Sequence, residues 1–236
     1  MSKTFKSEGV VLRSLKYSET SLILDIYTQL HGMGSYIVSG VRKAKSKSSN
    51  VYHPMTIINL VAYHPGESLS RIKEGSYAYR YKNLDSDIFR SAIGTFFVDL
   101  VKSSIKEKEA NESLFHFIKQ TLVQLDTNPL HGLLPILFAL DLAPYLGFQL
   151  GENHSAENPY FDMMSGEYID NDIRHSYILN DHLSQILYDV STQRTAVKLD
   201  KIDRRLLLDA LMQYYKLHIE EFKELRSLPV LRTILS

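Results

Sequence analysis

The chain has 236 residues, of which 44% are hydrophobic, and its formal net charge is zero. This length and apolar content allow one large domain or two modest ones and exclude disorder throughout. Because the chain has no cysteine, disulfides and thiolate zinc sites are excluded as well. The first residues lead directly into strand-like sequence, without the apolar run of a signal peptide or a membrane span. We therefore expect a cytoplasmic protein that needs no cofactor.

The neutral total conceals an uneven distribution of charge. Residues 1–80 contain eleven Lys and Arg against five Asp and Glu, whereas residues 81–236 contain sixteen against twenty-two. The two parts therefore have net charges of +6 and −6. Such an asymmetry suggests that the two parts meet different partners, and the basic part is the candidate for binding phosphate.

The first third of the chain is rich in β-branched and aromatic residues in short runs, which are typical of strands. We expect five strands, over residues 8–17, 21–28, 36–40, 55–63 and 68–78. The sequence QLHGMG at 29–34 supplies two glycines for a reversal between the second and third strands. Because no helix separates most of these strands, the pattern predicts a small closed barrel rather than a βαβ sheet.

From Asp85 onward the apolar residues recur at helical spacing. The first expected helix presents an apolar face of Ile88, Ala92, Phe96 and Leu100. A second begins after Asn111 as N-cap and ends at Asn128-Pro129, and a third covers 131–146 and ends at Gly147.

Residues 147–172 are polar and irregular, and within them 160–162 and 166–169 can pair as a short hairpin. Further helices begin at Asp181 and after Asp200. The last of these is expected to share one apolar face among Ile202, Leu206, Leu207, Ala210, Leu211 and Tyr214. The sequence thus predicts an α+β protein, with a five-stranded barrel in residues 1–80 and an α-helical domain in 81–236.

The strongest functional signal is a basic loop at 40–50, which holds Arg42, Lys43, Lys45 and Lys47 among glycine and small hydroxyl residues. Cations on flexible stems suit a phosphate backbone, and each neutralised phosphate releases counterions. The alternative is an ordinary solvated loop. On the expected strands, Arg13, Lys16, Arg71 and Lys73 extend the candidate DNA-binding set.

Four tyrosines, Tyr36, Tyr52, Tyr63 and Tyr77, are interleaved with these cations. Tyrosines beside cations are typical of sequence-tolerant binding to single strands. In a small barrel, however, a structural role in the core is the stronger interpretation.

Signals for catalysis are weak. The chain has no phosphate-binding glycine loop ending in Lys-Ser or Lys-Thr, and no GxGxxG, GxSxG or HExxH motif. The histidines of the second part never recur at ligand spacing. A hydrolase with a metal site built from His154, Asp162 and His175 stays as a minor alternative, and screens with divalent cations would test it.

Several short motifs occur in the order found in one known family. They are Glu8-Gly-Val-Val-Leu12, Tyr17-Ser-Glu19-Thr-Ser21, His31-Gly32, Gly40-Val-Arg42, Pro54, Gly147-Phe148, Tyr215-Lys-Leu-His218 and Leu225-Arg-Ser-Leu228-Pro-Val-Leu231. In their joint order they resemble the RecO family of bacterial recombination mediators, over nearly the whole chain.

The resemblance implies an N-terminal OB-fold of roughly eighty residues on a helical C-terminal domain, without catalytic turnover. Proteins of this family bind single- and double-stranded DNA, anneal complementary strands and contact the acidic, hydrophobic tail of the single-strand-binding protein. They work with RecR, in some cases with a RecF-like protein, to help load the RecA recombinase. A non-catalytic scaffold whose barrel binds a peptide remains the alternative.

Two details complete the expectations. Many family members have four cysteines as a zinc finger in the segment that corresponds to 147–166, and this chain has none. We therefore expect no metal, and ordinary packing of the hairpin in its place.

A hydrophobic groove with an arginine rim would suit the acidic tail of the single-strand-binding protein. The candidate arginines are Arg204, Arg205, Arg226 and Arg232. They can equally be plain helix-surface charges.

Overall fold

The structure is a computed structural model that describes residues 4–41, 47–63, 69–105, 109–170 and 175–235. The chain forms two compact units, Met1–Pro129 and Leu130–Ser236. The first unit has seventeen Lys and Arg against twelve Asp and Glu, and the second has ten against fifteen. The charge asymmetry therefore remains when the chain is divided at Pro129, with net charges of +5 on the first unit and −5 on the second.

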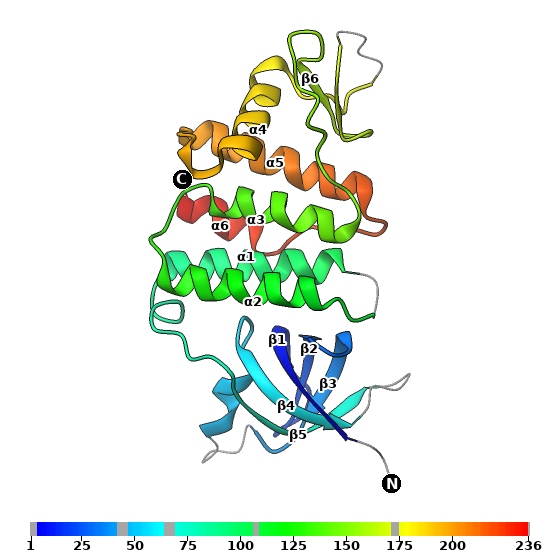
Figure 1. Cartoon of the computed structure of the whole chain (residues 1–236). Helices are drawn as coiled ribbons and strands as arrows, with labels where there is room; N and C mark the ends of the chain where they lie inside the picture. Colours follow the sequence, from blue (N-terminus) through cyan, green and yellow to red (C-terminus); the bar gives the residue numbers. More distant parts are fainter. Residues whose placement is uncertain (1–3, 42–46, 64–68, 106–108, 171–174, 236) are drawn as a thin grey trace. The chain divides into compact units, whose positions relative to one another are not determined.

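The first unit is built on a closed barrel, as predicted. Its strands pair in the order β1-β2-β3-β5-β4, with β4 also pairing with β1. Every pairing is antiparallel except that of β3 with β5. A five-stranded barrel of this kind is an OB-fold, and Figure 1 shows it. The strands are β1 (Thr4–Lys16), β2 (Leu22–Thr28), β3 (Gly32–Val38), β4 (Ile57–Tyr63) and β5 (Ser70–Tyr77).

Two of the four tyrosines singled out from the sequence lie inside the barrel. Tyr36 and Tyr52 are buried in the core with alternate residues of β2 and β4, so the structural interpretation is confirmed for both. The sequence prediction began β3 too late, because Gly34 lies within the strand rather than in the turn. A Cβ at Gly34 would meet the ring of Tyr36 at 2.8 Å, so packing rather than turn geometry requires this glycine. A short 3-10 helix over Lys47–Tyr52 was not predicted.

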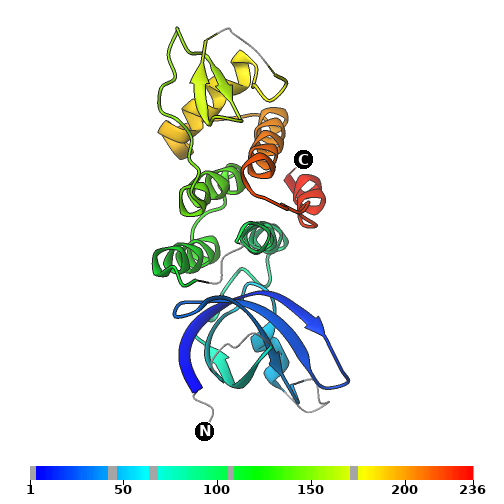
Figure 2. The same ribbon diagram turned by 90° about the vertical axis from the view of Figure 1, so that its right-hand side faces the viewer.

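Two helices complete this unit, and they lie over the outside of the barrel (Figures 1 and 2). Helix α1 (Ile88–Ser104) follows the N-cap Asp87, and α2 (Glu112–Thr127) follows the predicted N-cap Asn111, whose side chain accepts the Leu114 N–H. Most of the predicted apolar face of α1 is buried, but Ile88 is 68% exposed. It is the first residue of the helix.

A buried carboxylate joins the end of α2 to the segment that leaves the barrel. Asp126 accepts the backbone N–H groups of Asn83 and Leu84, each at 2.8 Å, and that of Lys82 at 3.0 Å. The hydroxyl of Tyr79 donates to its second oxygen at 3.1 Å. This one side chain therefore fixes how residues 79–84 run from β5 toward α1.

The second unit is mainly helical. Its elements are α3 (Leu134–Leu142), η2 (Ala143–Leu146), β6 (Tyr160–Asp162), β7 (Glu167–Ile169), α4 (Asp181–Gln193), η3 (Arg194–Ala196), α5 (Lys201–His218) and α6 (Leu228–Leu235). The predicted stop at Gly147 is confirmed, with the left-handed φ of 86° that favours glycine. The predicted third helix was too long, since its last turn is 3-10, and α6 was not predicted. No helix within the described residues is long and apolar enough to cross a membrane.

The expected hairpin is present, and aromatic rings hold it. β6 and β7 pair antiparallel, with Phe161 opposite Tyr168. Phe161 packs edge-on against Tyr168 and Tyr214, and His154 stacks on Tyr188 at 4.6 Å between ring centroids. Packing of this kind fixes the hairpin through side chains of α4 and α5.

Candidate nucleic-acid interface and arginine-lined groove

The outer surface of β2 and β3 is the face that OB-folds commonly use for ligands. Since Leu22, Leu24, Tyr36 and Val38 point into the core, the residues between them point outward. Strand register places Leu15, Ile23, Ile37 and Arg71 in one transverse row across four strands. This row is apolar at three positions and cationic at the fourth.

The neighbouring row contains the one predicted DNA-binding cation that has an acidic partner within the described residues. Arg13 Nε lies 2.6 Å from Asp25 Oδ2, and the Ser35 hydroxyl donates to the other oxygen at 3.0 Å. Lys102 Nζ lies 3.9 Å from the same carboxylate. Because Asp25 already compensates Arg13, this pair adds no net charge to the middle of the face. Sequence reasoning missed this pair because its partners lie twelve residues apart on different strands.

Three other predicted cations are exposed and have no ion-pair partner among the described residues: Lys16, Arg71 and Lys73. Lys73 lies in a β-bulge, where Val61 pairs with Glu74 and Ala62 with Ile72. It lines a wide hollow of about 850 Å³ together with Lys6, a cation that sequence reasoning did not select. The strand register across β1, β4 and β5 was the missing signal.

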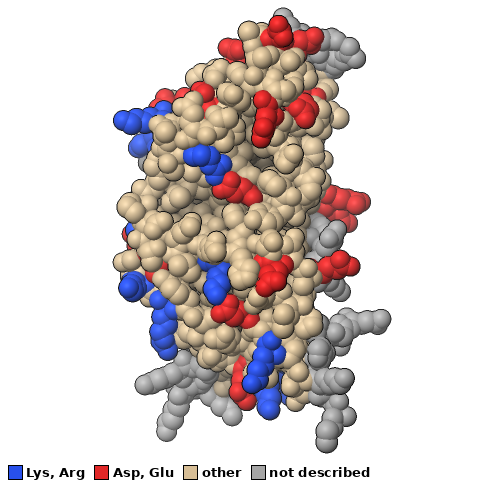
Figure 3. Space-filling model, viewed as in Figure 1, with Lys and Arg blue, Asp and Glu red and all other residues tan. Residues whose placement is uncertain are grey.

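The other predicted DNA-binding cations are the four of the basic loop. Arg42, Lys43 and Lys45 lie outside the described residues, and of Lys47 only the backbone, at the start of the 3-10 helix, is described. On the face seen in Figure 3, described cations and carboxylates of the barrel lie near one another, so this surface is not uniformly basic.

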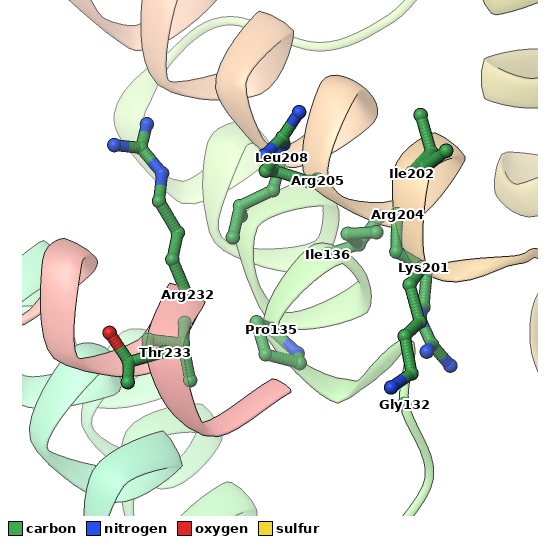
Figure 4. A pocket seen from close by; sticks show the side chains of 11 residues that line it. Gly132, Pro135, Ile136, Lys201, Ile202, Arg204, Arg205, Leu208, Arg232 and Thr233 are labelled. Atoms are coloured by element: carbon green, nitrogen blue, oxygen red, sulfur yellow. The ribbon is translucent and has the colours of Figure 1, made fainter. Parts of the chain in front are cut away.

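The second unit has an apolar groove of about 440 Å³ between α3, α5 and α6. Pro135, Ile136 and Leu208 form part of its lining. In Figure 4, Arg232 comes from α6 on one side, whereas Lys201 and Arg204 come from the start of α5 on the other. Three of the four predicted peptide-binding arginines therefore meet at this groove, namely Arg204, Arg205 and Arg232.

The three arginines differ in their surroundings. Arg204 and Arg205 have no ion pair or hydrogen bond within the described part of the chain, whereas Arg232 is paired with Asp209. The guanidinium of Arg204 lies against Gly132, where any Cβ would clash with it. Arg226 is exposed but does not line the groove. An apolar floor beside uncompensated guanidinium groups suits a ligand that is both apolar and anionic.

The minor metal-site alternative gains little from the geometry. Asp162 and His175 approach to 3.5 Å between Oδ1 and Nε2, but the His154 ring is stacked on Tyr188. No group of three or more metal-ligating side chains occurs among the residues that the structure describes.

Two family models match consecutive parts of the chain. The model described as "Recombination protein O N terminal" matches residues 1–81, and "Recombination protein O C terminal" matches 85–158. A protein of Flavobacterium psychrophilum named "DNA repair protein RecO" is 30% identical over 239 residues, covering 98% of this chain and 99% of the relative. The chain belongs to the RecO family. This membership assigns it to DNA repair and recombination.

Other RecO proteins agree with this assignment. The "DNA repair protein RecO" of Bacteroides fragilis is also 30% identical over 239 residues, with 97% of this chain and 98% of the relative covered. That of Bacillus cytotoxicus is 28% identical over 157 residues, or 66% of this chain and 59% of the relative. The resemblance read from the short motifs is confirmed, and with it the OB-fold followed by helices.

Proposed function

We propose that this RecO chain is a non-catalytic mediator of DNA repair and recombination whose barrel binds the phosphate backbone of single- and double-stranded DNA without reading sequence. The observation that carries the proposal is the net charge of +5 on the unit that contains the OB-fold, against −5 on the other. Lys16, Arg71 and Lys73 supply exposed cations on described strands, and the basic loop at 40–50 follows β3 in the sequence.

Salt dependence tests this assignment. If about four phosphates are neutralised on single-stranded DNA, log K falls against log salt with a slope of about −3. Replacing Arg42, Lys43, Lys45 and Lys47 together by alanine is expected to make the slope less negative, since Lys16, Arg71 and Lys73 remain. Arg13→Ala is the matched control, because Asp25 already compensates this cation, and it is expected to leave the slope unchanged. An unchanged slope in the fourfold variant would place the DNA surface elsewhere.

We propose further that the groove of the second unit binds the acidic, hydrophobic tail of the single-strand-binding protein. The support is chemical: apolar lining from α3 and α5 accepts the hydrophobic end, and Arg204 and Arg205 offer guanidinium groups to carboxylates. These cations are uncompensated in a unit that is acidic overall, so their position next to an apolar hollow calls for an anionic partner.

Charge reversal distinguishes the groove from the rest of the surface. In fluorescence polarisation with a labelled tail peptide, Arg204→Glu with Arg205→Glu is expected to abolish binding. Arg226→Glu removes the same kind of charge outside the groove and is expected to leave affinity unchanged. Equal loss in both variants would mean that only the overall charge matters.

We propose that the chain also anneals complementary strands. It works with RecR, and in some cases with a RecF-like protein, to help load RecA on DNA coated by the single-strand-binding protein. Annealing of oligonucleotides coated by the cognate single-strand-binding protein, with and without this chain, tests this step directly. Failure to retard any DNA at low salt would instead favour a scaffold whose barrel binds a peptide. The apolar row of Leu15, Ile23 and Ile37 is the feature that such a scaffold would use.

A further inference from the structure

Among the three arginines of the groove, Arg232 alone has an acidic partner within the described residues. Its Nε donates to Asp209 Oδ1 at 3.1 Å, and its Nη2 donates to the same oxygen. The two side chains come from different helices, α6 and α5, and are 40% and 38% exposed. The pair therefore borders solvent and can exchange partners.

The pair also stands between two hollows. Arg232 lines the 440 Å³ groove, and both Arg232 and Asp209 line a neighbouring hollow of about 280 Å³. The neighbouring hollow has apolar walls from Met212, Phe222 and Leu225. The backbone that presents Arg232 is anchored below it, since Leu231 is fully buried and its N–H donates to the Ser227 carbonyl at 2.9 Å. Only the side chain of Arg232 needs to move for its partner to change.

We infer that Asp209 is an internal competitor for the acidic ligand of this groove: its carboxylate occupies Arg232 until a ligand carboxylate replaces it. The inference rests on the proposed role of the groove. A guanidinium binds carboxylates best through two donors at once, and Asp209 occupies the edge formed by Nε and Nη2. An incoming acidic group must displace Asp209 to use that edge.

The exposure of the pair sets the size of the effect. Exposed ion pairs of this class shift an equilibrium by about twofold to fivefold, so Asp209 lowers ligand affinity without blocking the groove. It also acts selectively. A neutral apolar ligand makes no exchange at Arg232 and gains nothing when Asp209 is removed, whereas an acidic ligand gains a freed guanidinium.

The test uses the full chain and two labelled peptides: a run of aspartates followed by apolar residues, and the same peptide with asparagine at every aspartate. Asp209→Asn is expected to tighten binding of the acidic peptide by about twofold to fivefold and to leave the asparagine peptide unchanged. Glu224→Gln is the matched control, because Glu224 lines the same neighbouring hollow without an ion-pair partner among the described residues. It is expected to change affinity by less than Asp209→Asn.

A second background makes the outcome specific to the pair. In an Arg232→Gln chain, the gain from Asp209→Asn is expected to disappear. A gain that persists there, or an Asp209→Asn variant no tighter than the parent, would overturn the role of Asp209 while the groove assignment stands. If the parent chain binds neither peptide, or if reversing Arg204 and Arg205 has no effect, the proposed groove function fails and this inference fails with it.

Discussion

Asp126 is a buried carboxylate of the first unit. Replacing it by alanine is expected to lower the free energy of unfolding more than replacing any carboxylate that lies at the surface or caps a helix. Its side chain is fully buried, and it accepts three backbone N–H groups and the Tyr79 hydroxyl. A buried donor left unpaired costs about 1–3 kcal/mol. Part of residues 79–84 lies near solvent and can recruit water, so the four donors together are expected to cost about 3–5 kcal/mol.

Urea unfolding followed by circular dichroism measures this loss, and hydrogen exchange of the 82–84 amides locates it. Asp87→Ala is the matched control, since Asp87 caps α1 through the Phe89 and Arg90 N–H groups and a lost cap costs about 1 kcal/mol. The reasoning is refuted if Asp126→Ala costs no more than Asp87→Ala, or if the 82–84 amides exchange as slowly as in the parent.

The same side chain sets a pH dependence with a definite sign. Burial alone raises the pKa of Asp126, but the N–H groups of Asn83, Leu84 and Lys82 outweigh it and lower the pKa below its ordinary value. A folded pKa below the unfolded one gives stability that is complete above about pH 4 and is lost as the pH falls through the folded pKa. The difference in urea midpoint between the parent and Asp126→Ala should therefore shrink on acidification below about pH 4.

Three further predictions follow from single positions. The buried Tyr168 hydroxyl has no hydrogen-bond partner within the described structure, so Tyr168→Phe is expected to leave the thermal midpoint unchanged or to raise it; a clear fall would reveal a partner. Gly34→Val forces side-chain atoms into the Tyr36 ring and should lower the free energy of unfolding in urea by about 1–3 kcal/mol. Gly40→Ala is the control, since that position has open space around it, and it is expected to show only the smaller cost of a positive φ. Elemental analysis is expected to find no stoichiometric zinc, since the hairpin of β6 and β7 is held by aromatic packing.

The elements with strong local signals were predicted well. Alternate residues of β2 and β4 fill the barrel core, and the side chains of Asn111 and Asp200 accept the expected helix N–H groups. The sequence could not predict which residues of neighbouring strands lie side by side. The Arg13–Asp25 pair, the row that ends at Arg71 and the contribution of Lys6 all depend on strand register, which brings distant residues together.

The short helix α6 was missed by the sequence prediction for a related reason. Helix α6 has eight residues, and an isolated helix of that length is not stable in water. It exists because Leu231, fully buried, packs within the unit. Propensity and periodicity over so short a segment give too little signal to distinguish it from a loop.

The most informative error concerns Ile202 on α5. Periodicity assigned it to the buried face with Leu207 and Leu211, but it is 62% exposed and lines the groove, whereas those leucines are buried. A core isoleucine replaced by alanine costs about 2–5 kcal/mol. Here Ile202→Ala is expected to change unfolding free energy by less than about 0.5 kcal/mol, because the side chain has little burial to lose.

Its effect should appear in binding instead. If the tail peptide covers Ile202, the alanine variant loses buried apolar area only in the complex. We expect peptide binding to weaken by roughly tenfold, which corresponds to about 1.4 kcal/mol. This is somewhat less than the burial of two methylene groups, at about 0.8 kcal/mol each. Leu206→Ala, on the same helix and 39% exposed but outside the groove lining, is the control and should bind as the parent does. A stability loss for Ile202→Ala as large as that of a core position, with unchanged peptide affinity, would mean that this face of α5 is closed in solution and that the groove is not a ligand site.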